Sequence, residues 1–377
     1  MKMRLKLKAL THRWLTAGNA FPFSHECFRI DMDIELLRRL SNAFGPPGSE
    51  EEPREILRSE LEGAADEVAV DDLGNIFFRH RGEEGRPLVM LAAHMDEVSF
   101  LVTHIEEKGF LRFHTLGGIT DNLMPGQRIL LRGRKGPLYG IVGTKPPHIM
   151  SQEERSKLTP RDQLFIDIGA GSGGEAEEKG CYIGMRGVFD VEFRELGKGY
   201  IRGKAFDDRA GCFVMAEAFK VLRGSPCNVV AVGTVQEEVG LRGARTAAWQ
   251  ADPDYALALE GTYASDVPGS APHQESSGLR RGPVITIADR SIITHPRIMN
   301  ALLEAAEAEG IPYQFKKIPS GGTDAGAIHL TKAGIPSGTV ATPNRYIHGP
   351  AAVAHVEDLE NTVRLVTAFV RRISAAG

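Results

Sequence analysis

The stretch PLVMLAAHMD, residues 87–96, decides the fold of this chain. Its first seven residues are apolar without a break, which is typical of a strand buried on both faces in an α/β protein. The run ends at His94 and Asp96. Residues i and i+2 of an extended chain point to the same side, so both side chains can face one point in space. The stretch therefore predicts a central sheet strand that ends in two polar groups.

Length and composition indicate a globular enzyme. A chain of 377 residues is too long for one simple core, so we expect two domains. The net charge of −4 gives no reason to expect a nucleic-acid partner, and no apolar run reaches the length of a membrane span. The cysteines show no CxxC spacing and are interpreted as reduced thiols of a cytoplasmic protein. They are Cys27, Cys181, Cys212 and Cys227.

Residues 1–31 are expected to be a dispensable tail. Five Lys and Arg residues and no acidic residue occur in the first 25 positions. His12 and Arg13 interrupt any apolar segment, which argues against a secretory signal. Met32 opens a stretch that reads like the start of a domain.

Helix signals follow directly after Met32. Residues 33–44 have helical periodicity and stop at Gly45 and Pro46. Ser49 is predicted to cap the next helix, with Glu52 completing a capping box.

The middle of the chain has a different character. From about residue 117 to 190 glycine is dense, the predicted strands are short, and no long helical pattern occurs. This pattern favours a small β-barrel or β-sandwich inserted into a larger domain made of residues 32–116 and 191–377. On both sides of the insert, helices and strands alternate as in an α/β protein.

Further polar residues occur where apolar strands end or the next turn begins. In open α/β sheets, ligands bind outside the carboxyl ends of the strands. Taken singly, each residue has an ordinary explanation, such as a helix cap or a solvated strand end. Together they offer only nitrogen and oxygen donors, which suit a pair of Zn²⁺, Co²⁺ or Mn²⁺ ions. The residues are His94, Asp96, Asp207, Asp208, Glu237, Glu238, Glu260 and His348.

At these residues the sequence resembles the tetrahedral aminopeptidases, a dinuclear-metal family that includes deblocking and glutamyl aminopeptidases and some proteins labelled as cellulases. The matching stretches occur in family order over residues 32–377. They are AAHMDEVSFLVTHIEEKGFLRF, LGGITDNLMPGQRI, KAFDDRAGC, VQEEVGLRGA, ALEGTYASDVPG, GGTDAGAIHL and IPSGTVATPNRYIHGP.

The resemblance implies a fold and an assembly. The fold is α/β, with a mixed open sheet flanked by helices in a zinc-peptidase-like catalytic domain, and a small β-barrel inserted at residues 117–190. The insert is expected to be a dimerisation domain, with dimers assembling into a homododecamer. The substrate is expected to be a peptide.

The resemblance also implies a role for each ligand. His94 and Glu260 are expected to bind one metal ion, His348 and Glu238 the other, and Asp207 to bridge both. The two divalent ions are expected to be Zn²⁺ or Co²⁺. The position of Glu260 is often Asp in this family, and a carboxylate is retained here.

Three further expectations concern residues that do not bind metal. Glu237 is the general base. Asp96 holds the other ring nitrogen of His94, as metal-bound imidazoles usually require. Asp208 supports the ligands, and the peptide bond between Asp207 and Asp208 is expected to be cis.

The expected reaction is release of the N-terminal residue of a peptide by metal-activated water. One alternative is a deacylase or carboxypeptidase on the same two-metal core. The glutamate at position 260 favours this alternative. A second is a glycoside hydrolase, which needs two carboxyl groups and no metal, and so leaves His94 and His348 without a role. A third is a non-catalytic binding or assembly protein.

Overall fold

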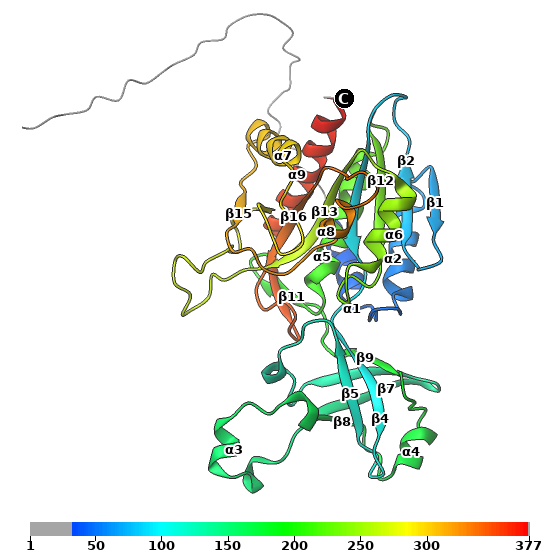
Figure 1. Ribbon diagram of the computed structural model, residues 1–377, viewed down its shortest axis with the longest axis vertical. Coiled ribbons are helices and arrows are strands. Elements are labelled where there is room, and N and C mark those ends of the chain that lie inside the picture. The colour runs from blue at the N-terminus through cyan, green and yellow to red at the C-terminus, as the bar shows by residue number, and fades with distance from the viewer. Residues whose placement is uncertain (1–31, 376–377) are drawn as a thin grey trace, which may run out of the picture. The chain divides into compact units, whose positions relative to one another are not determined.

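An eight-stranded mixed sheet forms the centre of the larger domain (Figure 1). The computed structural model describes residues 32–375, so the expected tail lies outside the described residues. The four inner strands β12, β3, β13 and β16 are parallel, whereas β1–β2, β2–β12 and β14–β16 are antiparallel pairs. In sheet order the strands are β1 (Glu67–Val70), β2 (Ile76–His80), β12 (Asn228–Thr234), β3 (Leu88–His94), β13 (Tyr255–Tyr263), β16 (Ser337–Asn344), β14 (Val284–Thr286) and β15 (Gln314–Lys316).

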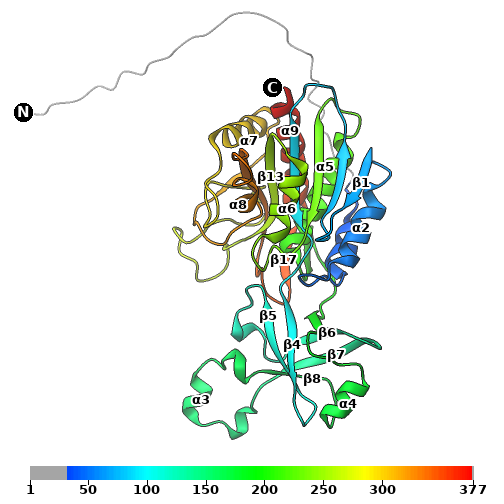
Figure 2. The same cartoon turned by 45° about the vertical axis from the view of Figure 1, so that its right-hand side comes forward.

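Helices cover both faces of this sheet, which confirms the α/β prediction (Figures 1 and 2). Alanines of α6 pack with Ile328 of α8 against alternate residues of the inner strands. Helix α5 packs against β3, β13 and β16 and is itself contacted by α1, α2 and α9. The helices are α1 (Ile34–Asn42), α2 (Glu51–Leu61), α5 (Phe206–Leu222), α6 (Arg242–Ala251), α7 (Pro296–Ala308), α8 (Ala325–Ile328) and α9 (Val356–Ala375).

The predicted cap of α2 is wrong. Its N-cap residue is Glu50, and no side chain makes a cap hydrogen bond there. Ser49 Oγ instead accepts a hydrogen bond from Arg186 Nη1 at 3.0 Å. Glu52 accepts one from the backbone N–H of Phe44 at 2.8 Å. Both side chains therefore tie the start of α2 to other segments.

The insert is a closed six-stranded barrel with its own apolar core. It begins at Ser99, earlier than the expected boundary at 117, because the hairpin of β4 and β5 pairs with β9 and β8 and not with the large sheet. Its strands are β4 (Ser99–Ile105), β5 (Leu111–Leu116), β6 (Arg128–Gly133), β7 (Gly136–Gly143), β8 (Phe165–Asp167) and β9 (Arg186–Phe189), with short helices α3 (Gln152–Ser156) and α4 (Gly173–Glu178).

A third, three-stranded sheet was not anticipated from the sequence. It consists of β10 (Arg194–Gly197), β11 (Tyr200–Gly203) and β17 (Ala352–His355). Each strand has only four residues, which is too short for a periodic pattern to stand out. Because β17 follows β16 after one loop, the large sheet fixes one end of the loop that carries His348, and this small sheet fixes the other.

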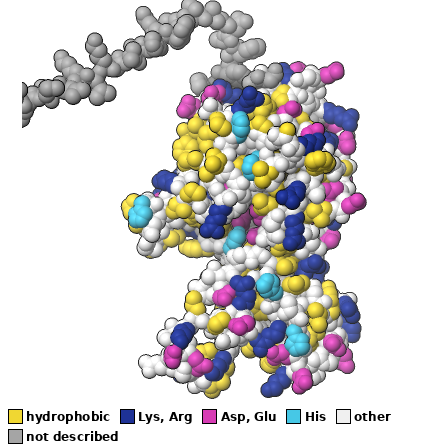
Figure 3. Space-filling model, viewed as in Figure 1, with side chains coloured by type: hydrophobic (Ala, Val, Ile, Leu, Met, Phe, Trp, Pro, Cys, Tyr) yellow, Lys and Arg dark blue, Asp and Glu magenta, His cyan; other side chains and the backbone are white. Residues whose placement is uncertain are grey.

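The surface of residues 32–375 carries both signs of charge. Figure 3 shows acidic and basic side chains interspersed on the face it draws, with hydrophobic side chains scattered among them. Within the described part of the chain, no helix is long and apolar enough to cross a membrane.

Candidate metal centre

The carboxyl ends of the inner strands bring the predicted polar residues together. Thr234 of β12 pairs with His94 of β3, and Ala258 of β13 pairs with Ala92. Glu260, two residues beyond Ala258, therefore lies at the level of His94. Because parallel strands end at one edge of a sheet, three segments distant in sequence meet at this edge.

Asp207 lies between the two histidines. Its Oδ1 is 3.4 Å from His94 Nε2, and its Oδ2 is 3.1 Å from His348 Nε2. The peptide bond from Asp207 to Asp208 is cis, as the resemblance implied. A Cβ at position 261 would lie 2.9 Å from the Asp207 Cα, so Gly261 of β13 is needed for this close approach. One carboxylate thus presents a separate oxygen to each histidine.

Three glutamates complete two groups around these histidines. Glu237 Oε2 and Glu260 Oε2 lie 3.8 and 3.6 Å from His94 Nε2. Glu238 Oε1 lies 3.5 Å from His348 Nε2. This Glu238 oxygen is buried and has no hydrogen-bond partner within the described residues. A buried oxygen of this kind needs a positive partner, and the donor set around it fits a divalent cation.

Backbone carbonyls orient both imidazole rings. His94 Nδ1 is 3.2 Å from the carbonyl oxygen of Asp96, and His348 Nδ1 is 3.1 Å from that of Gly118. A carbonyl only accepts, so each Nδ1 carries a hydrogen, and each Nε2 faces the acidic cluster as the nitrogen that can bind a metal ion once it has released its own proton. This is the arrangement found in metal-binding histidines.

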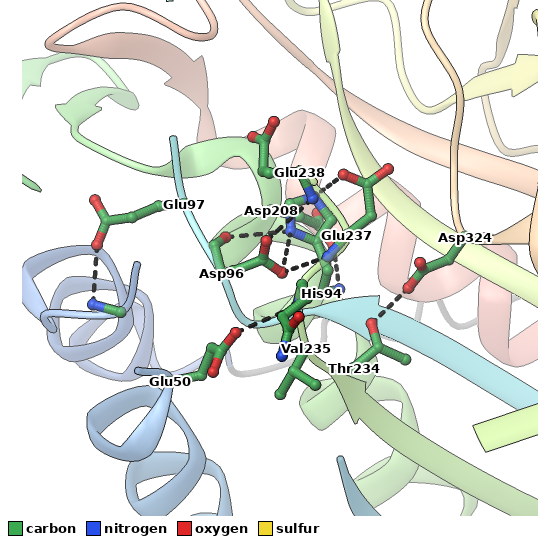
Figure 4. A network of polar contacts seen from close by, with 12 residues as sticks. Glu50, His94, Asp96, Glu97, Asp208, Thr234, Val235, Glu237, Glu238 and Asp324 are labelled. Carbon is green, nitrogen blue, oxygen red and sulfur yellow. Dashed lines mark hydrogen bonds and ion pairs between the residues drawn. The ribbon is translucent and has the colours of Figure 1, made fainter. Parts of the chain in front are cut away.

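Asp96 makes further contacts besides the expected one with His94. Its carboxylate is 3.5 Å from His94 Nδ1, and its own carbonyl oxygen is closer, at 3.2 Å. Its Oδ1 also accepts the backbone N–H of Glu237 at 2.9 Å, and its Oδ2 accepts that of Glu238 at 3.0 Å (Figure 4). Asp96 therefore holds the turn that carries both glutamates.

Asp208 is occupied by backbone groups. Its Oδ2 accepts the N–H of His94 at 3.1 Å, and its Oδ1 accepts that of Gly211 at 2.9 Å. Its oxygens lie close enough to His94 and Glu260 to form a third geometric group. Because both oxygens are already satisfied, we assign Asp208 to support the end of β3 and the first turn of α5.

Carboxyl groups outnumber imidazole rings in this site, and their surroundings shift their pKa values. Burial raises the pKa values of Glu237 and Glu260 well above the usual range, and neighbouring carboxylates add to this effect. Burial also raises the pKa of Glu238, to about 7. For Asp207, burial acts in the same direction, but hydrogen bonds to His348 and His94 outweigh it and lower the pKa. Such clustering of perturbed carboxyl groups is typical of a functional site.

One buried acid of this site was missed. The backbone N–H of Asp324 donates to Glu260 Oε1 at 3.1 Å, and its Oδ2 accepts from Thr234 Oγ1 at 2.5 Å. The other oxygen, Oδ1, is buried and has no hydrogen-bond partner among residues 32–375. The acid in GGTDAGA was an available signal, but the helix start at α8 explained it equally well. Through Asp324, the longer Glu260 side chain has one oxygen fixed while the other faces His94.

Comparisons with known sequences identify a matching family and similar proteins. A family model described as M42 glutamyl aminopeptidase matches residues 74–365. A lysyl aminopeptidase of Pyrococcus furiosus is 32% identical, covering 91% of this chain and 98% of that protein. A glutamyl aminopeptidase of Lactococcus lactis is 31% identical, covering 90% of this chain and 96% of that protein.

Several solved structures are also similar to this chain. A TET aminopeptidase from a marine-sediment archaeon of the Thaumarchaeota is 42% identical, with a TM-score of 0.88 over 90% of this chain and 96% of that one. The TET1 peptidase of Pyrococcus horikoshii, described as assembling into a tetrahedron or a large octahedral shell, is 35% identical, with a TM-score of 0.79 over 89% and 98%. A Thermotoga maritima protein described as an endoglucanase is 31% identical, with a TM-score of 0.74 over 90% and 98%.

Proposed function

The chain belongs to the M42 glutamyl aminopeptidase family, and from this premise we propose how its site removes N-terminal residues from peptides. It is a hydrolase of the aminopeptidase class, and peptidases of this family depend on metal. The observation that carries the proposal is the position of Asp207, with one oxygen beside His94 and the other beside His348.

Two divalent ions are assigned to the two groups. His94, Glu260 and Asp207 Oδ1 would hold one ion, and His348, Glu238 and Asp207 Oδ2 the other. Imidazole and carboxylate donors without thiolate suit Zn²⁺ or Co²⁺. Such ions, when bound, polarise the scissile carbonyl and lower the pKa of water.

Glu237 is assigned as the general base. It takes a proton from water as the water oxygen attacks the carbonyl carbon, and it passes the proton to the leaving amine nitrogen as the C–N bond breaks. Its Oε2 lies 3.8 Å from His94 Nε2, and Asp96 accepts its backbone N–H. Burial raises its pKa, which makes it a stronger base than an exposed glutamate.

The excess of carboxylates explains why the first residue would be removed. A free substrate α-ammonium group is positive and is attracted to the acidic cluster. Glu260 and Asp324 Oδ1 contribute negative charge on one side of this cluster. A blocked N-terminus lacks the charge, so an N-acetylated peptide should be a poor substrate.

The family relationship favours this function over the alternatives. Two of the curated relatives that cover most of this chain are named lysyl and glutamyl aminopeptidases. A glycoside hydrolase would leave His94 and His348 without a role in the reaction, whereas here both rings face one carboxylate. A carboxypeptidase or deacylase remains an outcome of the substrate test.

A homo-oligomer is supported by the TET relatives. We assign dimer formation to the barrel and expect dimers to assemble into a dodecamer. The barrel supports this with a surface pocket of about 850 Å³ lined by Phe165 and by the exposed side chains of Tyr139 and Ile141. Light scattering that gives the mass of one subunit would contradict it.

A cytoplasmic location is part of the same proposal. Cys181, Cys212 and Cys227 are free and buried, and free thiols are usual in a reducing compartment.

The experiment that tests the function compares two peptides of the same sequence. The purified chain is supplied with Zn²⁺ or Co²⁺ and offered the unblocked peptide and its N-acetylated form. We expect the first amino acid to be released from the unblocked peptide only, and a chelator to stop this release. Release of C-terminal residues or of the acetyl group would instead identify the carboxypeptidase or deacylase alternative.

A further inference from the structure

Two buried carboxylates hold three successive amides of the turn after β12. The N–H of Gln236 donates to Glu50 Oε1 at 3.2 Å. The N–H groups of Glu237 and Glu238 donate to the two oxygens of Asp96 (Figure 4). The turn that carries both glutamates is therefore fixed from α2 on one side and from the end of β3 on the other.

Gln236 has an uncommon backbone conformation. Its φ is 57°, in the left-handed region that residues other than glycine seldom adopt. Such a conformation persists only where the surroundings determine it. Here Glu50 accepts the N–H of Gln236. The backbone N–H of Arg242 donates to the carbonyl oxygen of Gln236 at 3.3 Å, and Arg242 Nη1 donates to Gln236 Oε1 at 3.1 Å. The sharp turn at this residue lets the neighbours Glu237 and Glu238 reach different histidines.

Glu50 neither caps its helix nor forms an ion pair within the described residues. Its side chain is almost fully buried, at 3% exposure, and does not cap the helix that it begins. No Lys, Arg or His nitrogen of residues 32–375 forms an ion pair with it. Its Oε1 accepts the N–H groups of Gly48, at 2.7 Å, and of Gln236. Burying an unpaired acid is costly, which indicates a role other than stabilising the fold.

We propose that Glu50 is a positioning residue for the aminopeptidase reaction: it fixes the backbone of Gln236 and so places the carboxylate of Glu237. The inference rests on the proposed function through the assignment of Glu237 as the base. The carboxylate of Glu50 contacts the N–H of Gln236, whereas the N–H of the assigned metal ligand Glu238 is held by Asp96, so we expect the loss of Glu50 to affect turnover and to leave metal content and KM unchanged. A base displaced by about an ångström typically slows a reaction by up to about 10²-fold.

The kinetic test separates the hydrogen-bond acceptor from the charge. Glu50→Gln keeps the acceptor without the charge, whereas Glu50→Met keeps the volume without the acceptor. Glu50→Asp keeps the charge but ends one methylene short of Gln236. We expect kcat to fall by roughly 10- to 100-fold in Glu50→Met and Glu50→Asp, with unchanged KM and bound metal, and to stay near wild type in Glu50→Gln. Glu51→Met, an exposed acid of the same helix end, is the matched control and should behave as wild type.

Amide hydrogen exchange on the metal-free full chain gives a readout that does not depend on activity. The amide of Gln236 should exchange faster in Glu50→Met and Glu50→Asp than in wild type, Glu50→Gln or Glu51→Met. If Glu50→Met does not fold, Glu50→Asp carries the comparison. The proposal is overturned if both variants keep wild-type kcat, if Glu50→Gln falls as far as they do, or if exchange at Gln236 is unchanged. Failure of the proposed function would appear separately, as a wild-type chain that cleaves no unblocked peptide.

Discussion

The two halves of the candidate metal centre differ in how the chain supports them. His94 ends a central strand, and its side chain is only 2% exposed. His348 lies in the loop between β16 and β17, has a φ of 57°, and is 36% exposed at its side chain. The first ring is oriented by the carbonyl of Asp96, two residues away, and the second by that of Gly118, which follows the barrel strand β5.

This difference indicates that one half is built by the sheet and the other by loops. Strand pairing fixes the level of His94 relative to Glu260, so this half follows from the fold itself. The His348 half depends on a loop whose partner comes from the inserted barrel. We therefore expect the two halves to respond differently when a ligand is removed, and the same way when the residue they share is removed.

The largest effect should come from the shared residue. Asp207→Asn removes the negative charge that both histidines face, so we expect both ions to be lost and peptide hydrolysis to fall to the level of the buffer blank. Bound metal and turnover are measured together. Asp208→Asn is the matched control and should keep measurable activity, because an amide still accepts one of its two backbone hydrogen bonds. Equal losses of metal and turnover in the two variants would contradict the assignment of Asp207 as the ligand shared by both ions.

The histidines should separate the two halves. His348→Ala opens a position near solvent, where water can replace the ring, so excess Zn²⁺ or Co²⁺ should restore part of the activity. His94→Ala leaves buried carboxylates without their nearest imidazole, and excess metal should restore much less. The measurement is turnover as a function of metal concentration for both variants. Restoration of His94→Ala alone would reverse the comparison.

Asp96→Asn should have a smaller effect that reaches both halves. One oxygen of the carboxylate becomes an NH₂ group, which cannot accept the N–H of Glu237 or Glu238. Losing a partner of this kind typically costs about 10- to 100-fold in metal affinity or activity. Metal affinity and kcat are measured against Asp66→Asn, a change at an exposed acceptor of a backbone N–H beside the edge strand β1. An Asp96→Asn enzyme indistinguishable from that control would exclude a role for this hydrogen-bonded turn.

The pH dependence of stability should be the smallest effect. Burial raises the pKa of Glu238 from 4.5 to about 7, so the metal-free fold loses stability as pH rises through this window. Burial opposes a rise for His348, but Glu238 and Asp207 raise its pKa to about 10. Its stabilising contribution is full below about 6.5 and also declines as pH rises. Both groups therefore make the metal-free chain less stable at pH 8 than at pH 6.

Metal binding requires these ligands without their protons, so the rise in melting temperature on adding metal should be larger at pH 8 than at pH 6. Scanning calorimetry of metal-free and metal-loaded protein at both pH values measures this difference. A larger rise at pH 6 would mean that Glu238 and His348 do not take part.

The sequence was most informative where a strand pattern carried the signal. The apolar run before His94 predicted a strand buried on both faces, and the structure confirms it, with every residue from Val89 to His94 buried. The edge where the ligands meet followed from the ends of such strands. The barrel boundary was placed too late, because a hairpin at residues 99–116 gives the same local pattern whether it pairs with the large sheet or with the barrel.

Contacts that join distant segments had no local signal. Glu50 looked like an ordinary acid at a helix start, and its contact with Gln236 depends on how α2 packs beside β12. Asp324 likewise looked like part of a helix start, although its backbone N–H fixes Glu260. The carbonyl that orients His348 belongs to Gly118. Every residue has a backbone carbonyl, so the type of residue at position 118 could not indicate this contact.

The central claim is that two adjacent glutamates have separate tasks, and metal analysis combined with turnover tests it most directly. We expect wild type to bind two ions per chain. Glu237→Gln should keep both while kcat falls by about 10²–10⁴-fold, the usual contribution of a positioned base. Glu238→Gln should lose metal first and regain part of its activity in excess metal. The account is contradicted if Glu237→Gln empties the site, or if Glu238→Gln keeps both ions and loses turnover.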